Sequence, residues 1–164
     1  MIYFIQQKIT AHVLPKRGIA IKTRILDNFW SIYVALPSAE GEKINWINYK
    51  SGEKNIFFKM AADNNSASIA IELTHPDISH QQLVFEQFEQ MKNLLHAVLQ
   101  EDWTWEFKNF DENGKLVSRI YTEIKEVSIY KKDDWPELIR FFKDRIIALD
   151  EFWSSAKYIF ETFR

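Results

Sequence analysis

The stretch Trp103-Thr104-Trp105-Glu106-Phe107, followed by Asn113-Gly114 and by residues 119–124, decides the fold of this chain. Apolar and polar residues alternate on both sides of Asn113-Gly114, and Asn-Gly is the strongest short signal for a two-residue β-hairpin loop. Such a loop places Trp105 opposite Thr122, and in this register the apolar residues of both strands share one face. The stretch therefore predicts an antiparallel hairpin with one buried face and one face in water.

Three apolar runs precede the hairpin, at residues 44–49, 56–60 and 68–73. Gly, Ser, Asn and Asp separate them, and these residues favour tight turns. Short connections between strands require antiparallel pairing, so the runs predict a three-strand meander. With the hairpin, and a short last strand at residues 127–130, they predict a sheet of five to six strands.

Helical periodicity appears in three places, at residues 19–35, at residues 79–100 and from Asp134 to the C-terminus. Ser79 and Gln82 match a capping box at the start of the second helix. The third helix is longer than most, so we expect a break near residues 143–145. The fold class is therefore α+β, an antiparallel sheet packed against about three helices. Residues 19–164 form a single domain, and residues 1–18 form an N-terminal tail or an extra strand.

The composition restricts the classes of function. The 164 residues carry a formal net charge of −2 and include no cysteine. Disulfides, thiolate metal sites and a cysteine nucleophile are therefore excluded, and the charge does not favour a nucleic-acid partner. The first residues do not have the pattern of a signal peptide and no apolar run approaches about 20 residues, so we expect neither a signal peptide nor a membrane span. We expect a cytoplasmic protein with no cofactor and no membrane partner.

Acidic strand residues offer one catalytic interpretation, a divalent-metal-dependent hydrolase that acts on nucleic acid. Nucleases of the restriction-enzyme type hold magnesium with an Asp and a Glu-x-Lys on adjacent strands, because hard cations need oxygen ligands. Glu123 and Lys125 have that spacing, and Asp102 lies near Glu123 in the predicted register. Asp63 with Glu72 is a second version. The alternative is that all of them are solvated strand and turn charges.

A second candidate site is a metal site formed by His75, Asp77 and His80, which lie within six consecutive residues. Imidazole and carboxylate groups are common ligands of zinc and of other transition metals. The loop ends at a predicted helix N-terminus, however, where the helix dipole is positive and disfavours a cation. The alternative is an ordinary loop with a helix cap.

A third candidate is a small-ligand site around the run at residues 44–49. Aromatic and amide side chains together suit a base, a sugar or a peptide, whereas Asn is depleted in ordinary strands. The alternative is an edge strand whose amides face water and whose Trp46 belongs to the core. The candidate residues are Glu40, Lys43, Asn45, Trp46, Asn48 and Tyr49.

The C-terminal helix carries an apolar stripe as far as Phe160. If this helix extends beyond the body of the domain, its far end buries against a second copy and forms a homodimer. No convergent set of catalytic residues is present, which favours a non-enzymatic binding or protein-interaction domain. The hydrolase and the small-ligand binder remain as alternatives.

Several motifs together resemble an uncharacterised bacterial family, the domain of unknown function numbered 4268. The resemblance covers about residues 19 to 160 and implies no activity, cofactor or catalytic residue. Some members are attached to nuclease-like segments, and some carry Pro at the position of Asp144, which agrees with a helix break there. The motifs are Ser38-Ala39-Glu40-Gly41-Glu42-Lys43-Ile44-Asn45-Trp46, Lys59-Met60-Ala61-Ala62-Asp63-Asn64, Ser118-Arg119-Ile120-Tyr121 and Asp133-Asp134-Trp135-Pro136-Glu137-Leu138-Ile139.

Overall fold

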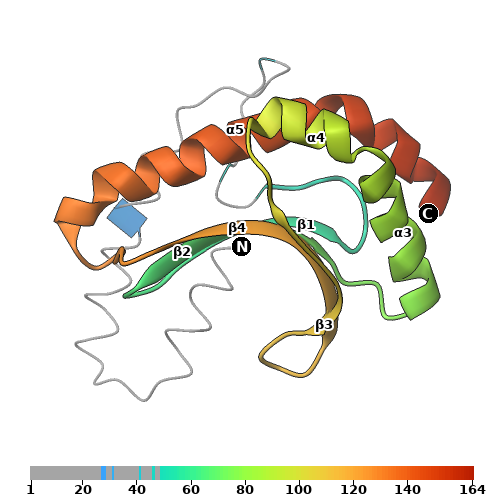
Figure 1. Cartoon of the computed structure of the whole chain (residues 1–164), viewed down its shortest axis with the longest axis horizontal. Coiled ribbons are helices and arrows are strands. Elements are labelled where there is room, and N and C mark those ends of the chain that lie inside the picture. The colour runs from blue at the N-terminus through green and yellow to red at the C-terminus, as the bar shows by residue number, and fades with distance from the viewer. Residues whose placement is uncertain (1–26, 29–30, 32–40, 42–45, 47–48) are drawn as a thin grey trace.

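The computed structural model describes residues 27–28, 31, 41, 46 and 49–164. Its described residues form one antiparallel sheet of four strands in the order β1-β2-β4-β3. Helices cover one face of this sheet, with α4 and α5 side by side above the strands (Figure 1). The elements are β1 (Ile56–Ala62), β2 (Ser66–Leu73), α3 (Ile78–Gln90), α4 (Lys92–Leu99), β3 (Thr104–Phe110), β4 (Leu116–Lys125), η2 (Lys132–Asp134), α5 (Trp135–Phe160) and η3 (Glu161–Phe163).

The core lies between the sheet and the helices. Alternate residues of each central strand point towards it, as the period of a half-buried strand requires, and Ile69 and Ile71 are fully buried. The helices contribute large aromatic rings, and Phe88 lies 4.4 Å from Phe160 between ring centroids. The α+β class and the antiparallel sheet are thus confirmed. The largest buried side chains are Trp46, Trp153, Phe58, Phe88, Phe142, Phe152, Phe160, Met60, Ile69 and Ile71.

The prediction of five to six strands is wrong, because the described residues form four. Of the strand predicted at residues 44–49, Trp46 lies in a 3-10 turn and Tyr49 lies outside any strand, and residues 44, 45, 47 and 48 lie outside the described residues. Both rings are buried, and the Tyr49 hydroxyl donates to Asp150 Oδ1 of α5 at 2.7 Å. Both side chains therefore belong to the core.

Residues 127–130, predicted as a last strand, do not form one. The amides of Val127 and Ile129 donate to the carbonyls of Asn65 and Asp63 in the β1–β2 turn, at 3.3 and 3.0 Å. These two bonds hold the segment against the end of the sheet without extending the ladder. Of the predicted helix at residues 19–35, Asp27, Asn28 and Ser31 are helical, and the rest lies outside the described residues. The predicted tail or strand at residues 1–18 also lies outside them.

Two of the helices differ from the prediction, one in where it begins and is interrupted and the other in being continuous. The helix predicted at residues 79–100 is interrupted at Met91, whose backbone (φ −98°, ψ 8°) separates α3 from α4. It begins with Asp77 as its N-cap rather than Ser79, because the Asp77 carboxylate accepts from the Ser79 and His80 amides. By contrast, α5 is continuous through the expected break. Arg145 stays helical and donates to the Phe141 carbonyl and to both carboxylate oxygens of Glu101.

The β3–β4 hairpin forms, but its register differs from the prediction by two residues. Its loop contains three residues, because the Asp111 amide donates to the Lys115 carbonyl at 2.9 Å and Gly114 takes a left-handed φ of +74°. A β-bulge between Glu106 and Asn109 adds the second shift, so Trp105 pairs with Ile120 instead of Thr122. Two shifts of one residue restore the original faces, and the bulge bends the strand. Figure 1 shows the hairpin curling away from the helices.

Candidate binding site on the open face of the sheet

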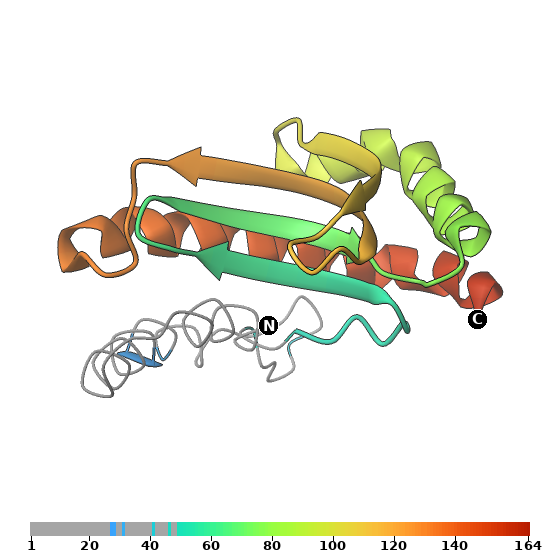
Figure 2. The same cartoon turned by 90° about the horizontal axis from the view of Figure 1, so that it is seen from below.

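The sheet face opposite the helices carries a row of side chains that crosses all four strands. Phe57 of β1 pairs with Glu72 of β2, Glu72 pairs with Arg119 of β4, and Arg119 pairs with Glu106 of β3. Figure 2 looks onto this face, with α5 behind the strands. Because every second residue of a strand points to the same side, Lys59 and Tyr121 extend the row along the sheet.

The charged groups of this face neutralise one another. Lys59 Nζ lies 2.8 Å from Glu72 Oε2, and Arg119 Nη2 lies 3.4 Å from Glu106 Oε2. The Arg119 guanidinium also lies over the Tyr121 ring at 4.4 Å, and the Tyr121 hydroxyl donates to Glu106 Oε1 at 3.0 Å. The result is a polar network that holds the side chains of β3 and β4 in place.

This network shifts the pKa values of two of its members, Glu106 and Tyr121, in opposite directions. The side-chain amide of Asn109 donates to Glu106 at 2.9 Å and, with Tyr121 and Arg119, lowers the pKa of the Glu106 carboxyl. Burial, together with the bond to Glu106, raises the pKa of the Tyr121 hydroxyl. At neutral pH, Glu106 is therefore a carboxylate and Tyr121 a neutral phenol.

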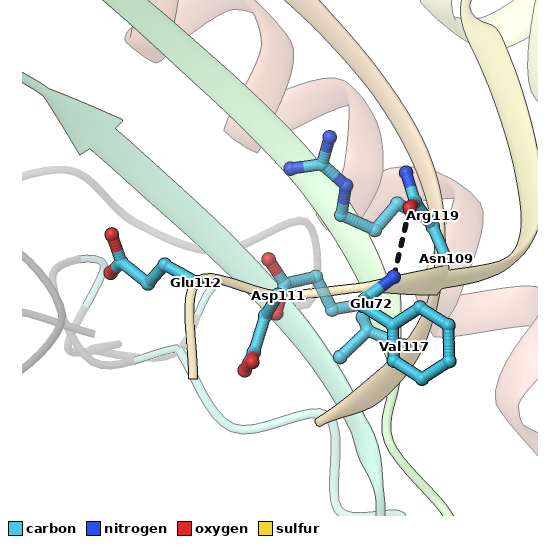
Figure 3. Close-up of a pocket in the computed structure, with 7 residues that line it drawn as sticks. Glu72, Asn109, Asp111, Glu112, Val117 and Arg119 are labelled. Atoms are coloured by element: carbon cyan, nitrogen blue, oxygen red, sulfur yellow. Dashed lines mark hydrogen bonds between the residues drawn. The ribbon is translucent and has the colours of Figure 1, made fainter. Parts of the chain in front are cut away.

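The bent hairpin and the open face together enclose a pocket of about 210 Å³. Glu72, Val117 and Arg119 line it from the sheet, and residues 109–112 line it from the hairpin (Figure 3). Glu72 is only 8% exposed, whereas the Phe110 ring is 66% exposed. The pocket thus combines a desolvated carboxylate with an aromatic ring that is open to solvent.

A buried polar cluster fixes the bend of the hairpin against α3. The Lys108 amide, at the bulge, donates to Ser118 Oγ at 3.1 Å, and Ser118 donates to Gln81 Oε1. The Gln81 amide nitrogen donates to the carbonyls of His75 and Leu116, at 3.0 and 3.4 Å. Lys108 has a left-handed φ of +57°, which is unfavourable for a residue with a side chain and needs such support.

Sequence reasoning named Glu72 only as a metal ligand with Asp63, and it missed the hairpin residues that complete this pocket. Asn109, Phe110 and Glu112 were not considered for any site, because the bulge that bends them under the sheet has no clear sequence signal. One clue was available. Glu72 is a charged residue in the otherwise apolar strand Ser66–Leu73, and a buried carboxylate needs a local reason.

The residues predicted for a hydrolase are not brought together. Asp63 lies in the β1–β2 turn, where its Oδ1 accepts from the amides of Asn65 and Ser66 at 2.8 Å. Glu72 lies six residues beyond Ser66 along β2, or about 20 Å at 3.3 Å per residue. This separation is far larger than two ligands of one metal ion permit.

The Glu-x-Lys pair of the same prediction is also separate from Glu72. Glu123 pairs with Ser68, four residues or about 13 Å along β2 from Glu72. Its carboxylate lies 3.1 Å from Lys125 Nζ, and Asp102 contacts His96 at 2.8 Å instead of Glu123. Hydrolase activity stays a prediction that this geometry does not favour.

The proposed metal ligands His75, Asp77 and His80 have other contacts. The two imidazole rings stack with centroids 3.9 Å apart, and His80 Nε2 donates to the Phe163 carbonyl at 2.6 Å. Asp77 caps α3, and the amides of His80 and Ser79 lower the pKa of its carboxyl. Among the described residues, no group of three His, Asp or Glu side chains is placed to hold a metal ion. A metal role for these three residues stays a prediction.

The predicted small-ligand site falls partly on residues that are not described. Glu40, Lys43, Asn45 and Asn48 lie outside the described residues. Trp46 is 1% exposed, which agrees with the alternative interpretation of its ring as part of the core. Tyr49 stacks on Phe58 at 5.2 Å and binds Asp150. Ligand binding by this segment stays a prediction.

In the part of the chain that is described, no helix combines the length and the apolar character needed to cross a bilayer.

Comparison with known proteins assigns the chain to a protein family by its sequence. No curated protein and no solved structure matches the chain. The model of one family matches residues 25–157, which is most of the 164 residues. The chain belongs to this family, which is described as Domain of unknown function (DUF4268).

Proposed function

We propose that this protein is a non-enzymatic binding domain that receives a segment of a partner protein on the open face of its sheet, at the hairpin pocket. The observation that carries the proposal is the pocket itself, with the exposed Phe110 ring at its edge and the buried Glu72 carboxylate in its wall. Exposed aromatic rings beside desolvated polar groups are typical of protein-interaction surfaces.

The protonation states on this face support binding rather than catalysis. A general acid or base works best when its pKa lies near the working pH. The pKa of Glu106 is displaced downward and that of Tyr121 upward, so both groups hold one protonation state at neutral pH. They act as fixed hydrogen-bonding groups that keep the binding surface rigid.

The charges of the pocket support a protein partner rather than a nucleic acid. Glu72, Asp111 and Glu112 contribute three carboxylates to the lining, against the single guanidinium of Arg119. Nucleic-acid binding depends on cationic groups that neutralise phosphates, and these carboxylates repel phosphates instead. The absence of cysteine and the resemblance to a bacterial family support a place in the bacterial cytoplasm.

Site-specific photo-crosslinking in the native host cell tests this proposal. The photoreactive residue p-benzoyl-phenylalanine replaces Phe110 in one variant and the exposed Glu89 of α3 in a control variant. We expect a discrete protein adduct from the Phe110 position that the Glu89 position does not give. Identical adducts from both positions, no adduct at Phe110, or an adduct that nuclease treatment removes would contradict the proposal.

A further inference from the structure

We infer that the last four residues, η3 (Glu161–Phe163) and Arg164, form a C-terminal clasp that holds the start of α3 where it bends the hairpin, so that opening the clasp loosens the hairpin pocket. This inference rests on the proposed function and adds a means of regulating the same site. It follows the hydrogen bonds that run from the clasp, through the first turn of α3, to the bulge of β3.

An ion pair fastens the clasp to the turn before β1. The Arg164 guanidinium donates to both carboxylate oxygens of Glu53, with N–O distances of 2.6, 3.0 and 3.1 Å. The Glu53 side chain is only 7% exposed, and among the described residues Arg164 is the one cation that pairs with it. A nearly buried carboxylate is strongly destabilised when its cation is removed. The pair therefore favours the closed clasp.

A second contact fastens the clasp to the first turn of α3. His80 Nε2 donates to the Phe163 carbonyl at 2.6 Å, and the C-terminal end of the chain lies beside α3 in both views (Figures 1 and 2). The other nitrogen of the ring, Nδ1, is buried and has no hydrogen-bond partner among the described residues. The bond to Phe163 is thus the one hydrogen bond of this ring in the described part of the chain, and the position of His80 depends on the clasp.

The next residue of α3, Gln81, supports the bend of the hairpin. Its Oε1 accepts from Ser118, and Ser118 Oγ accepts from the Lys108 amide at the bulge. The two supports share His75, because its ring stacks on His80 with centroids 3.9 Å apart and its carbonyl accepts from the Gln81 amide nitrogen at 3.0 Å. Since His80 and Gln81 are adjacent in one helical turn, a movement that frees His80 also displaces the buried side chain that holds the bulge.

The clasp is built to open before the rest of the fold. It is a single turn at the end of the chain, where local opening costs least, and Glu161 and Thr162 are exposed. The Arg164 side chain is 60% exposed, so water and salt ions compete for it, and high ionic strength favours the open clasp. Phe160, by contrast, is buried in the core at 1% exposure, which confines the opening to the four residues that follow it.

Amide hydrogen exchange of the full chain tests the coupling. Arg164→Ala opens the clasp, and Arg140→Ala, at an exposed position of α5, is the matched control. We expect the Lys108 amide to exchange at least about fivefold faster in Arg164→Ala, the factor that corresponds to one ordinary hydrogen bond, and at the wild-type rate in Arg140→Ala. Sodium chloride at about 1 M should speed this exchange in the wild type and have less effect in Arg164→Ala.

His80→Phe is the second variant, because a Phe ring can still stack on His75 while the donor to Phe163 is removed. It should speed the exchange of the Lys108 amide in the same direction. If both variants speed exchange only within residues 161–164, the clasp is an ordinary frayed end and the inference is wrong. An equal increase at all amides, including those between β1 and β2, would show a global loss of stability and would also overturn the inference.

The two proposals fail in different ways. Photo-crosslinking from position 110 should fall at least about fivefold in the Arg164→Ala background and stay unchanged in the Arg140→Ala background. If the yield is the same in both backgrounds and in the wild type, partner binding stands and regulation by the clasp is wrong. If the clasp variants speed exchange at Lys108 but no protein crosslinks from position 110 in the wild type, the coupling stands and the proposed function is wrong.

Discussion

Substitution of Ser118 by alanine tests whether the polar cluster beneath the bulge holds the hairpin in its bent form. Ser118 and Gln81 are both fully buried. Without the Ser118 hydroxyl, Gln81 Oε1 loses the hydrogen-bond donor that the described residues give it, and the Lys108 amide loses its acceptor. A buried polar group left unpaired costs about 1–3 kcal/mol. Because Lys108 is exposed and its amide can turn to water, we count only the Gln81 oxygen, which predicts a destabilisation of about 1–3 kcal/mol.

Urea denaturation followed by tryptophan fluorescence measures this free energy of unfolding. An unchanged slope would show that the loss is one of stability rather than of compactness. Hydrogen exchange gives a local readout, because the Lys108 amide should exchange faster while the amides of α5 change only with global stability. Ser155→Ala, at an exposed position of α5, is the control and should change stability by no more than about 0.5 kcal/mol. A Ser118→Ala protein as stable as the control, with unchanged exchange at Lys108, would refute the reasoning.

Three further predictions concern charge, packing and assembly. Because the folded state lowers the pKa of Glu106, its carboxylate stabilises the fold above its unfolded pKa of about 4.3, and this stability is lost as the pH falls through the folded value. Urea titrations should therefore show a smaller loss of stability at acid pH for Glu106→Gln than for the wild type, and equal losses would contradict the assignment. Phe88→Ala should cost about 3–5 kcal/mol because the ring is fully buried, whereas Phe110→Ala should change the melting temperature little. Tyr158 is 60% exposed near the end of α5. If the C-terminal helix joins two copies of the chain, Tyr158→Glu should convert the dimer into a monomer, which light scattering would detect. A dimer that survives the substitution would place the interface elsewhere.

Local sequence patterns predicted those parts of the fold whose stability depends on neighbours in the chain. Alternation located β1, β2 and the two strands of the hairpin, and helical spacing located α3, α4 and α5. The alternation also placed Trp105 and Ile120 on the same face of the hairpin, as the structure has them. The longer loop and the bulge each shift the register by one residue, and two such shifts leave every side chain on its predicted face. The number of strands among the described residues was wrong, because Trp46 and Tyr49 have the composition of a strand but pack into a core formed by distant elements.

The candidate site was much less predictable than the fold. Glu72 was predicted only as a metal ligand with Asp63, whereas its ion-pair partner comes from β1 and the other side of its pocket comes from the far end of the β3–β4 hairpin. The predicted acid pairs failed to meet because sequence spacing does not show which residues lie at the same level of neighbouring strands. That level depends on the ladder register, and the register of β3 depends on a bulge supported by Gln81, which lies 37 residues from Ser118.

The sequence by itself therefore determined the class of the fold, the identity of its main elements and the absence of cysteine chemistry, because hydrophobic period and composition are properties of short segments or of the whole chain. Only the tertiary structure decided the bend of the hairpin, the pairing of Glu72 with Lys59 and the pocket beside Phe110. The physical reason is that these features depend on the satisfaction of buried polar groups, and the groups that satisfy them come from segments far apart in the chain.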